Sequence, residues 1–332
     1  MSASFIESIR TKAKKNLKHI VLPEGTDERM IKAADFVHRE KIAKITLLGN
    51  EQVIKNKAKD LGIDLSHTPI IDPTRSPQLD EYSKEYFEIR KHKGITQAEA
   101  CERMSNELFY GAMMVRRGIA DGGVAGAVNS TGDVMLAAFH LIGKAKGVSI
   151  VSSFFSMIIP EYLDQKEVNL FFADCAIIPN PNAEELADIA IATADSRKAL
   201  VGDEPKIAML SFSTKGSAKS EAVDKVIEAT HLVKVKRPDL AIDGELQVDA
   251  AIVPSVGKSK APGSSIAGHA NVLVFPDLQA GNIGYKLVQR LANAVAFGPL
   301  SQGLAKPFND LSRGCSVDDI VNVIAACSVK SI

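Results

Sequence analysis

Residues 19–50 read HIVLPEGTDERMIKAADFVHREKIAKITLLGN, and this stretch decides the fold class. The apolar runs HIVLP and KITLLGN flank a segment whose apolar residues recur with the period of a helix. Thr26 and Asp27 stand before that segment and can cap a helix that continues through Ala43. Continuous apolar runs joined by a helix are typical of parallel strands covered on both faces. The stretch therefore predicts an α/β fold with a mostly parallel sheet.

The same alternation continues along the chain. Residues 77–91 are highly charged and have the pattern of a helix. A second helix opens at Thr96, which forms a capping box with Glu99, and this helix is predicted to run towards Gly118. Residues 121–143 then read as a strand, a loop of small residues and a helix. This part of the chain therefore repeats the strand–helix unit of a parallel sheet.

A change after Gly147 indicates a second domain. Longer apolar runs, VSIVSSFFSMII, NLFFADCAII, KIAMLSFS and ANVLVFPDL, alternate there with alanine-rich helical segments. Further on, Gly and Pro again punctuate the chain, which ends in a helix that starts at about Ser316. We therefore predict one domain of residues 1–146 and 296–332, and an inserted domain of residues 147–295.

The composition excludes several classes of protein. The 332 residues include 40 Lys and Arg and 40 Asp and Glu, so the formal net charge of zero argues against nucleic-acid binding. Hydrophobic residues at 45% and charged residues at 24% are typical of a globular chain rather than a disordered one. No apolar run approaches the roughly 18 residues of a membrane span, and the N-terminus has no apolar signal core. The four cysteines are scattered without a C-x-x-C pair, so we expect a cytoplasmic enzyme with no metal site.

Common catalytic motifs are absent from the sequence. Residues 257–259 have the Gly-Lys-Ser tail of a P-loop, but Ile252 stands where its first glycine is required. The glycines of residues 122–126 do not match the dinucleotide fingerprint, and neither H-E-x-x-H nor G-x-S-x-G occurs. These observations argue against nucleotide hydrolysis, zinc proteolysis and serine esterase chemistry.

Residues 298–320, GPLSQGLAKPFNDLSRGCSVDDI, are the strongest functional signal. Ser312 and Arg313 lie in a loop just ahead of the predicted final helix, whose free N–H groups favour an anion. The arginine adds a permanent charge suited to a phosphate or a carbonyl. Asp319 is either the capping-box partner of Ser316 or a general base. Cys315 is either a small buried side chain or a nucleophile.

Two other polar segments have a structural and a functional interpretation. Residues 90–94, Arg-Lys-His-Lys-Gly, are either the basic end of a helix or part of an anion site. Residues 129–133, Asn-Ser-Thr-Gly-Asp, lie between a predicted strand and a helix. Their hydroxyl and amide groups either cap that helix or hold an oxyanion or phosphate.

With these residues in view, the whole chain resembles the phosphate acetyltransferases (phosphotransacetylases) of the short, single-module type. The resemblance implies reversible acetyl transfer between acetyl phosphate and coenzyme A, both of which are substrates, with no other cofactor and no metal. It implies two three-layer α/β domains similar to the isocitrate and isopropylmalate dehydrogenases, an active site in the cleft, and a homodimer formed through the inserted domain. The motifs that carry it are LPEGTDER, RKHKG, MLSFSTKGSA, IDGELQVDAAIVP, KSKAPGSSIAGHANVLVFPDL, GNIGYK and KPFNDLSRGCS.

The resemblance also assigns roles to residues. It implies that Asp319 is the base for the thiol of coenzyme A, and that Ser312 and Arg313 lie at the reacting carbonyl and phosphate. It makes Arg90 a phosphate-binding residue and Arg29 a contact for a phosphate of coenzyme A. The remaining substrate-binding residues that it implies are Ser130, Thr131, Asn282, Tyr285, Lys286 and Cys315.

One position departs from the family pattern. We call residues 129–133 the hydroxyl loop. In the family, the helix after this loop usually carries an arginine, and this chain has Leu136 at that position. Lys144 or Lys286 could supply the missing positive charge. The departure leaves the acyl preference open, so a phosphate butyryltransferase, or another short-chain phosphate acyltransferase, is the alternative function.

The chemistry restricts the mechanism. Moving a proton from a thiol, with pKa near 8.5, to an ordinary Asp carboxylate, with pKa near 3.9, costs about 6 kcal/mol. Burial of the carboxyl group, or positive charge that stabilises the thiolate, must therefore reduce this cost. We expect direct attack of the thiolate on acetyl phosphate in a ternary complex, and the rival is an acyl-enzyme on Cys315. An NAD-dependent decarboxylating dehydrogenase would share the fold but lacks its fingerprint here, and nothing suggests a non-catalytic binding module.

Overall fold

The computed structural model describes residues 3–331, which form two compact units. The N-terminal unit comprises residues 6–145 and 304–331, and the inserted unit comprises residues 146–303 together with residues 3–5. The chain thus leaves the N-terminal unit after residue 145 and returns to it at residue 304 for its last strand and last helix.

The stretch of residues 296–303, which the sequence assigned to the N-terminal domain, lies in the inserted unit. Most of it forms β10 (Val295–Gln302), which pairs antiparallel with β5 (Ser152–Tyr162). Backbone hydrogen bonds to β5 therefore keep this segment with the inserted unit, and the chain returns to the N-terminal unit at Leu304. Glycine and proline in a sequence mark a break in pattern, but they do not show which sheet the next strand joins.

The N-terminal unit is built on a five-stranded, fully parallel sheet with the order β11-β4-β1-β2-β3. The predicted strand–helix–strand over residues 19–50 is confirmed, and Asp27 caps its helix as predicted, but the helix ends at Arg39 rather than at Ala43. The elements of this unit are α1 (Ala3–Lys15, whose residues 3–5 group with the inserted unit), β1 (His19–Leu22), α2 (Glu28–Arg39), β2 (Lys44–Leu48), α3 (Glu51–Asp60), β3 (Ile70–Ile71), η1 (Pro73–Arg75), α4 (Leu79–Arg90), η2 (Lys91–Lys93), α5 (Gln97–Met104), α6 (Glu107–Arg116), β4 (Gly122–Ala125), α7 (Thr131–Leu141), β11 (Phe308–Asp310) and α13 (Val317–Lys330).

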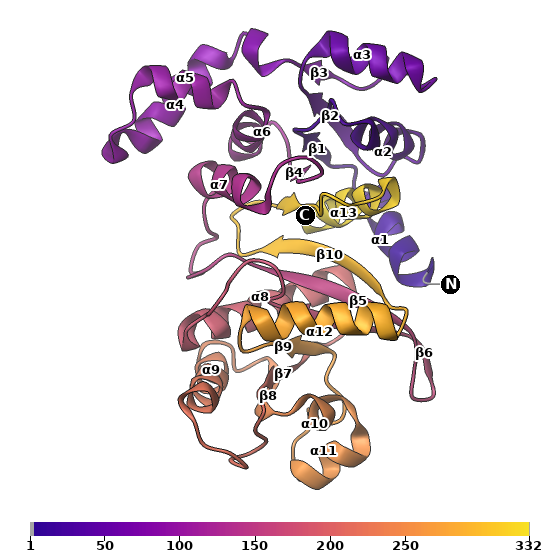
Figure 1. Ribbon diagram of the computed structural model, residues 1–332, viewed down its shortest axis with the longest axis vertical. Helices are drawn as coiled ribbons and strands as arrows, with labels where there is room; N and C mark the ends of the chain where they lie inside the picture. Colours follow the sequence, from indigo (N-terminus) through magenta and orange to yellow (C-terminus); the bar gives the residue numbers. More distant parts are fainter. Residues whose placement is uncertain (1–2, 332) are drawn as a thin grey trace. The chain divides into compact units, whose positions relative to one another are not determined.

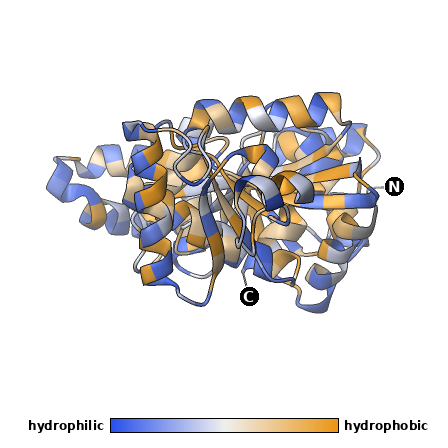
Figure 2. Cartoon of the chain, turned by 90° about the horizontal axis from the view of Figure 1, so that it is seen from below, coloured by the Kyte–Doolittle hydropathy of each residue, from blue (hydrophilic) through white to orange (hydrophobic). Residues whose placement is uncertain are grey.

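Helices cover both faces of this sheet, as a parallel sheet requires. Figure 1 shows α2 and α13 on one side of β1, β2 and β4, and α6 and α7 on the other. The apolar core beneath α6 and α7 includes Tyr82, Tyr110 and Phe308, which are almost completely buried. Figure 2 shows polar and apolar residues interspersed along the helices, whereas α6 and α13 are buried along most of their length.

The predicted helix from Thr96 towards Gly118 is wrong in one respect, because two helices occupy this segment. The capping box of Thr96 and Glu99 starts α5 as predicted, but α5 ends at Met104. Asn106 then accepts hydrogen bonds from the backbone N–H groups of Leu108 and Phe109 and starts α6. Asn is a strong N-cap residue, so a side chain within the periodic pattern restarts the helix in a new direction.

The inserted unit has a six-stranded mixed sheet with the order β10-β5-β6-β9-β7-β8. The strands β6, β9, β7 and β8 are parallel, whereas β10, β5 and β6 form antiparallel pairs. Helix α8 packs on β6, β7 and β9, and α12 packs on β5, β6 and β10. The further elements are β6 (Gln165–Ala173), α8 (Ala183–Leu200), β7 (Lys206–Leu210), α9 (Glu221–Lys236), β8 (Ala241–Leu246), α10 (Val248–Ile252), α11 (Pro254–Lys260), β9 (Val272–Val274) and α12 (Leu278–Leu291).

Among the described residues, no helix is both long enough and apolar enough to cross a membrane.

Candidate active site

Loops that follow three neighbouring strands meet at the carboxyl edge of the N-terminal sheet. The strands β11, β4 and β1 are adjacent and parallel, so their carboxyl ends lie at the same edge. The loops are residues 311–316 after β11, residues 126–130 after β4 and residues 23–27 after β1. In open α/β sheets, this edge is where ligands usually bind. We call residues 311–316, 126–130 and 23–27 the loop cluster.

The carboxylate of Glu24 organises the loop after β4. Its side chain is buried, and Oε2 accepts hydrogen bonds from the backbone N–H groups of Gly126 and Ala127, at 2.9 and 2.8 Å. Oε1 accepts hydrogen bonds from the backbone N–H groups of Val128 and Asn129, at 3.0 and 2.8 Å, and from the Asn129 side chain at 2.8 Å. One buried carboxylate thus satisfies four consecutive backbone donors and determines the conformation of the loop.

The guanidinium of Arg29 joins all three loops. Its Nε and Nη2 donate to the two carboxylate oxygens of Asp27, at 3.0 and 2.8 Å. Nη2 also donates to the carbonyl of Ala127 at 2.8 Å. Nη1 donates to the carbonyls of Arg313 and Cys315, at 2.8 and 3.1 Å. These contacts use all five N–H groups that a guanidinium has.

This position gives Arg29 a structural role that the sequence did not reveal. Burial raises the pKa of Asp27 and the hydrogen bonds from Arg29 lower it, with a net lowering, so the pair is ionised. A contact between Arg29 and a phosphate of coenzyme A stays a prediction. Such a contact would have to replace one of the existing hydrogen bonds, because the guanidinium has no free N–H group.

Ser130 and Thr131 lie at the start of α7. Ser130 is the N-cap, since its hydroxyl accepts a hydrogen bond from the backbone N–H of Asp133 and donates one to the Asp133 carboxylate. The capping interpretation of this loop is therefore confirmed for Ser130. Thr131 is exposed, and its hydroxyl donates to Oδ2 of Asp310 at 2.6 Å.

Asp310 is a site residue that sequence reasoning missed. It is the last residue of β11, only 5% of it is exposed, and its Oδ1 has no hydrogen-bond partner among the described residues. Burial raises the pKa of Asp310 to about 6, the nearby Glu24 adds to the rise, and the hydrogen bond from Thr131 opposes it. The sequence feature that could have indicated Asp310 is an acidic residue at the carboxyl end of a short strand, directly before the Ser312–Arg313 loop.

Asp319 forms the predicted capping box. Its Oδ2 accepts hydrogen bonds from the backbone N–H and the hydroxyl of Ser316, at 2.9 and 2.8 Å. The backbone N–H of Asp319 donates to the Ser316 hydroxyl at 3.2 Å. The residue is exposed, as are Ser312 and Arg313. The role of Asp319 as a base stays a prediction, and so do the roles of Ser312 and Arg313 at the carbonyl and phosphate.

Cys315 is a buried residue of the loop cluster, and its Sγ lies 3.8 Å from Nη1 of Arg29. Burial raises the pKa of the Cys315 thiol to about 11, although the positive charge of Arg29 opposes the rise. A thiol with such a pKa is almost entirely protonated at neutral pH, which disfavours nucleophilic attack. The geometry therefore favours the interpretation of Cys315 as a packed side chain.

Arg90 lies at the end of α4 and lines a pocket of about 730 Å³ together with Tyr86, Lys93, Arg103 and His140. The same lining contains the carboxylates Glu99, Glu102 and Glu107, so the three basic residues are balanced. Burial, together with the positive charges of Arg90 and Arg103, lowers the pKa of His140, which stays neutral beside Tyr86. His140 and Thr131 lie at opposite ends of α7, roughly 13 Å apart at ~1.5 Å per residue. Arg90 is thus near the far end of α7.

Leu136 is 38% exposed on α7, and Phe139 on the same helix is 42% exposed. The helix therefore presents apolar side chains at the position where the family usually has an arginine.

The last three predicted residues lie on α12 of the inserted unit. Asn282 donates from Nδ2 to the carbonyl of Cys175 at 3.1 Å. Tyr285 stacks on Phe155 with ring centroids 4.3 Å apart, and Nζ of Lys286 lies 5.7 Å from the centroid of the Tyr285 ring. Their contacts to substrate stay predictions.

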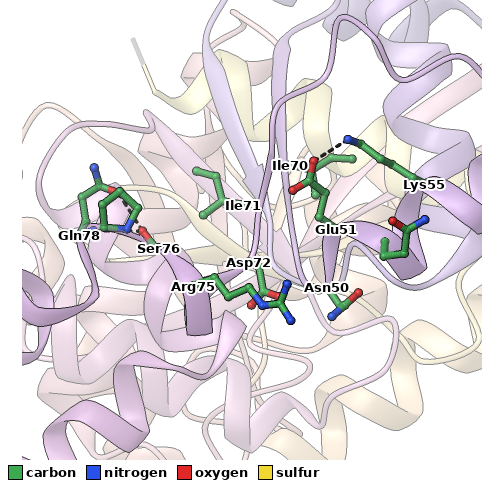
Figure 3. A pocket seen from close by; sticks show the side chains of 11 residues that line it. Asn50, Glu51, Lys55, Ile70, Ile71, Asp72, Arg75, Ser76 and Gln78 are labelled. Carbon is green, nitrogen blue, oxygen red and sulfur yellow. Dashed lines mark hydrogen bonds and ion pairs between the residues drawn. The ribbon is translucent and has the colours of Figure 1, made fainter.

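A further polar pocket, of about 510 Å³, lies beside the carboxyl ends of β2 and β3 (Figure 3). Glu51 and Lys55, one turn apart on α3, form an ion pair at 2.5 Å on one side of it, and the hydroxyl of Ser76 donates to Gln78 at 2.8 Å. None of the predicted site residues lines this pocket. We assign no function to it.

The role of Glu24 leads to a prediction about stability. In Glu24→Gln, an amide NH₂ group replaces one oxygen and faces backbone donors, which should cost about 1–3 kcal/mol of unfolding free energy. The amide protons of residues 126–129 should exchange faster, as measured by native-state hydrogen exchange. Glu28→Gln is the matched control, because Glu28 is exposed on the next helix. Equal protection of these amides in the wild type and in Glu24→Gln would contradict the role given to the carboxylate.

Comparison with known proteins places this chain in a family. Residues 4–327 match the family model described as Phosphate acetyl/butaryl transferase. A phosphate acetyltransferase from Thermoanaerobacterium thermosaccharolyticum is 55% identical over 328 residues, which are 99% of each chain. A phosphotransacetylase from Streptococcus pyogenes has 43% identity and a TM-score of 0.93 over 99% of this chain and 98% of that one.

A more distant likeness concerns the fold alone. A 4-hydroxythreonine-4-phosphate dehydrogenase from Klebsiella pneumoniae has 10% identity and a TM-score of 0.57 over 96% of this chain and 100% of that one. The predicted α/β fold of the dehydrogenase type is confirmed. The chain belongs to the phosphate acetyl/butaryl transferase family, and it is an acyltransferase of the phosphotransacetylase type.

Proposed function

We propose that this enzyme transfers an acetyl group reversibly between acetyl phosphate and coenzyme A. The relatives that share about half of its residues over nearly the full chain are phosphate acetyltransferases. The observation that carries the proposal is the loop cluster, where Glu24 and Arg29 hold two polar loops beside the start of α13. Backbone N–H groups at a helix start, together with the exposed Arg313, suit a phosphate or a developing oxyanion.

The mechanism we propose is direct attack in a ternary complex. The thiolate of coenzyme A attacks the carbonyl carbon of acetyl phosphate, and phosphate leaves. Arg313 stabilises negative charge on the sulfur and the phosphate, and Ser312 donates to the oxyanion. Asp319 receives the thiol proton, as the resemblance implies. Phosphate held by arginine is a good leaving group, so this chemistry requires no metal.

A second candidate function is transfer of a longer acyl group. Leu136 replaces the usual family arginine and is partly exposed on α7, close in sequence to the hydroxyl loop. An apolar side chain at this position favours binding of acyl phosphates with longer apolar chains, such as butyryl phosphate, over binding of acetyl phosphate.

Activity measurements distinguish the two functions. We expect the purified enzyme to form acetyl-CoA from acetyl phosphate and coenzyme A, with a kcat/KM that falls from acetyl to propionyl to butyryl phosphate. Leu136→Arg, which restores the family residue, should leave acetyl transfer intact and reduce butyryl transfer. A kcat/KM that is highest for butyryl phosphate would identify a butyryltransferase, and absence of thioester with all three would contradict both functions.

Cys315 provides the test of direct transfer. We expect Cys315→Ala to retain near-normal kcat, since the thiol is buried and protonated. The wild type should not exchange labelled phosphate into acetyl phosphate when coenzyme A is absent, because that exchange requires an acyl-enzyme. Exchange without coenzyme A that Cys315→Ala abolishes would show that the rival mechanism operates.

We also propose that the enzyme is a homodimer that associates through α12. Ile283, Leu287 and Leu291 are 59%, 53% and 80% exposed, and their spacing of four residues aligns them on one side of this helix. An apolar stripe of this kind is unfavourable in water, and two copies related by a two-fold axis would cover each other's stripe. The resemblance implies a homodimer formed through the inserted unit, to which α12 belongs.

Sedimentation equilibrium tests the dimer. The wild type should have the mass of two chains, and the double variant Leu287→Glu/Leu291→Glu should have the mass of one, because paired carboxylates cannot be buried without large cost. Ile227→Glu is the control, since Ile227 is similarly exposed on α9. A monomeric wild type, or a double variant that stays dimeric, would contradict an interface on α12.

A further inference from the structure

The buried carboxyl group of Asp310 accepts a hydrogen bond from an exposed residue, Thr131. Asp310 is 5% exposed, whereas Thr131, which donates to it at 2.6 Å, is exposed. The other carboxyl oxygen, Oδ1, has no hydrogen-bond partner among the described residues. It lies against Gly126, where a methyl group in place of hydrogen would collide with it. A buried carboxyl with an unsatisfied oxygen is costly and therefore calls for a function.

The direction of the hydrogen bond restricts what Thr131 can bind. A hydroxyl has one proton, and Thr131 gives that proton to Asp310. Its remaining lone pairs can only accept, so the next group along must donate a hydrogen bond to Thr131. A fully deprotonated anion cannot do so. Monohydrogen phosphate can, because it has one P–O–H group.

The charges around Asp310 also favour a proton shared between its carboxyl group and a bound phosphate. From the loop after β1, Glu24 faces Asp310 and disfavours its ionised form. From α7, the group that faces it is the Thr131 hydroxyl, and from the loop after β4 it is the backbone of Gly126. Among the described residues, no basic side chain contributes to the charge balance at Asp310. A phosphate placed on the same hydroxyl is therefore tolerated when a proton lies between the two anions.

Thr131 is also placed where a phosphate binds readily. It is the first residue of α7, a helix of 11 residues, and free N–H groups with the positive end of the helix dipole favour an anion there. The Asp319 carboxyl is different: it is exposed and accepts hydrogen bonds from Ser316.

We propose that Asp310, acting through the hydroxyl of Thr131, accepts the proton of the attacking phosphate and returns it when phosphate is the leaving group. This inference rests on the proposed function. It makes Thr131 a residue that contacts phosphate, and Asp310 a proton acceptor that acts through Thr131.

The step balances in the direction that consumes acetyl-CoA. An oxygen of monohydrogen phosphate attacks the carbonyl carbon of acetyl-CoA, and its proton passes to Oγ1 of Thr131. The original Thr131 proton passes to Oδ2 of Asp310. The C–O bond forms, the C–S bond breaks, and the thiolate of coenzyme A leaves and is then protonated. In the reverse direction, the proton returns from Asp310 through Thr131 to the departing phosphate, which would otherwise leave as a strongly basic trianion.

The experiment measures release of coenzyme A from acetyl-CoA and phosphate between pH 5 and pH 9. At saturating concentrations of both substrates, kcat reports groups in the bound complex rather than the titration of free phosphate. The wild type should lose kcat as the pH falls through about 6, where Asp310 takes up a proton. Asp310→Asn should lower kcat by about 100-fold or more and remove this dependence on pH. The asparagine oxygen can still accept the hydrogen bond from Thr131, so a purely structural role would survive the substitution.

Variants of Thr131 supply the second readout. Thr131→Val should lower kcat to the same extent as Asp310→Asn. Combining the two substitutions should cause no further loss, because both interrupt the same proton transfer from phosphate through Thr131 to Asp310. Thr131→Ser keeps the hydroxyl and should restore most of the activity. Thr131→Val should also raise KM for phosphate more than KM for acetyl-CoA. Asp60→Asn is the control, since Asp60 is an exposed carboxylate at the end of α3.

The outcomes separate this inference from the proposed function. A wild type that releases no coenzyme A contradicts the proposed function. An active wild type with Asp310→Asn that keeps both kcat and its fall near pH 6 overturns the inference alone. A rise in KM for acetyl-CoA, rather than for phosphate, in Thr131→Val also overturns it, because the proton would then belong to the thiol. If circular dichroism shows that Asp310→Asn is unfolded, the comparison of Thr131→Val with Thr131→Ser decides by the same criteria.

Discussion

The hydrogen bonds between the Glu24 carboxylate and the loop after β4 are the contact on which the rest of the site depends. Five donors from residues 126–129 converge on two oxygens of a buried side chain that comes from the neighbouring strand. A loop with so many backbone N–H groups directed at one point has one conformation rather than several. That conformation places Ser130 at the cap of α7 and Thr131 over Asp310.

Arg29 extends this arrangement from two loops to three. Its carbonyl acceptors are Ala127 in the loop after β4, and Arg313 and Cys315 in the loop after β11, and these two strands are adjacent in the sheet. The parallel order β11-β4-β1 makes this possible, because only parallel neighbours bring their following loops to the same edge. The family's polar motifs, which lie far apart in the chain, therefore meet through the topology of one sheet and two charged side chains, the buried Glu24 and the partly exposed Arg29.

The site contains two carboxyl groups whose surroundings differ. Asp319 is exposed and serves as a helix cap, whereas Asp310 is buried, and its pKa is raised to about 6. The mechanism we propose moves two different protons, that of the thiol and that of the phosphate, and enzymes assign such roles to carboxyl groups in unlike environments. Cys315, by contrast, is buried without the positive surroundings that would make its thiol reactive at neutral pH, since burial outweighs Arg29 and its pKa is about 11.

The sequence by itself determined the local elements and the family. The strands of residues 19–50, the N-cap at Asp27 and the capping boxes at Thr96 and Ser316 depend on residues within about four positions of each other, which a sequence pattern shows directly. Tertiary structure alone decided that Glu24 binds residues 126–129, that Arg29 bonds to Arg313, and that Asp310 lies beneath Thr131. These partners are about 100 to 280 positions apart in the chain. No periodic pattern in the sequence identifies the hydrogen-bond partner of a carboxylate or a guanidinium. The burial of such a group is determined only when strands from both ends of the chain pair in one sheet.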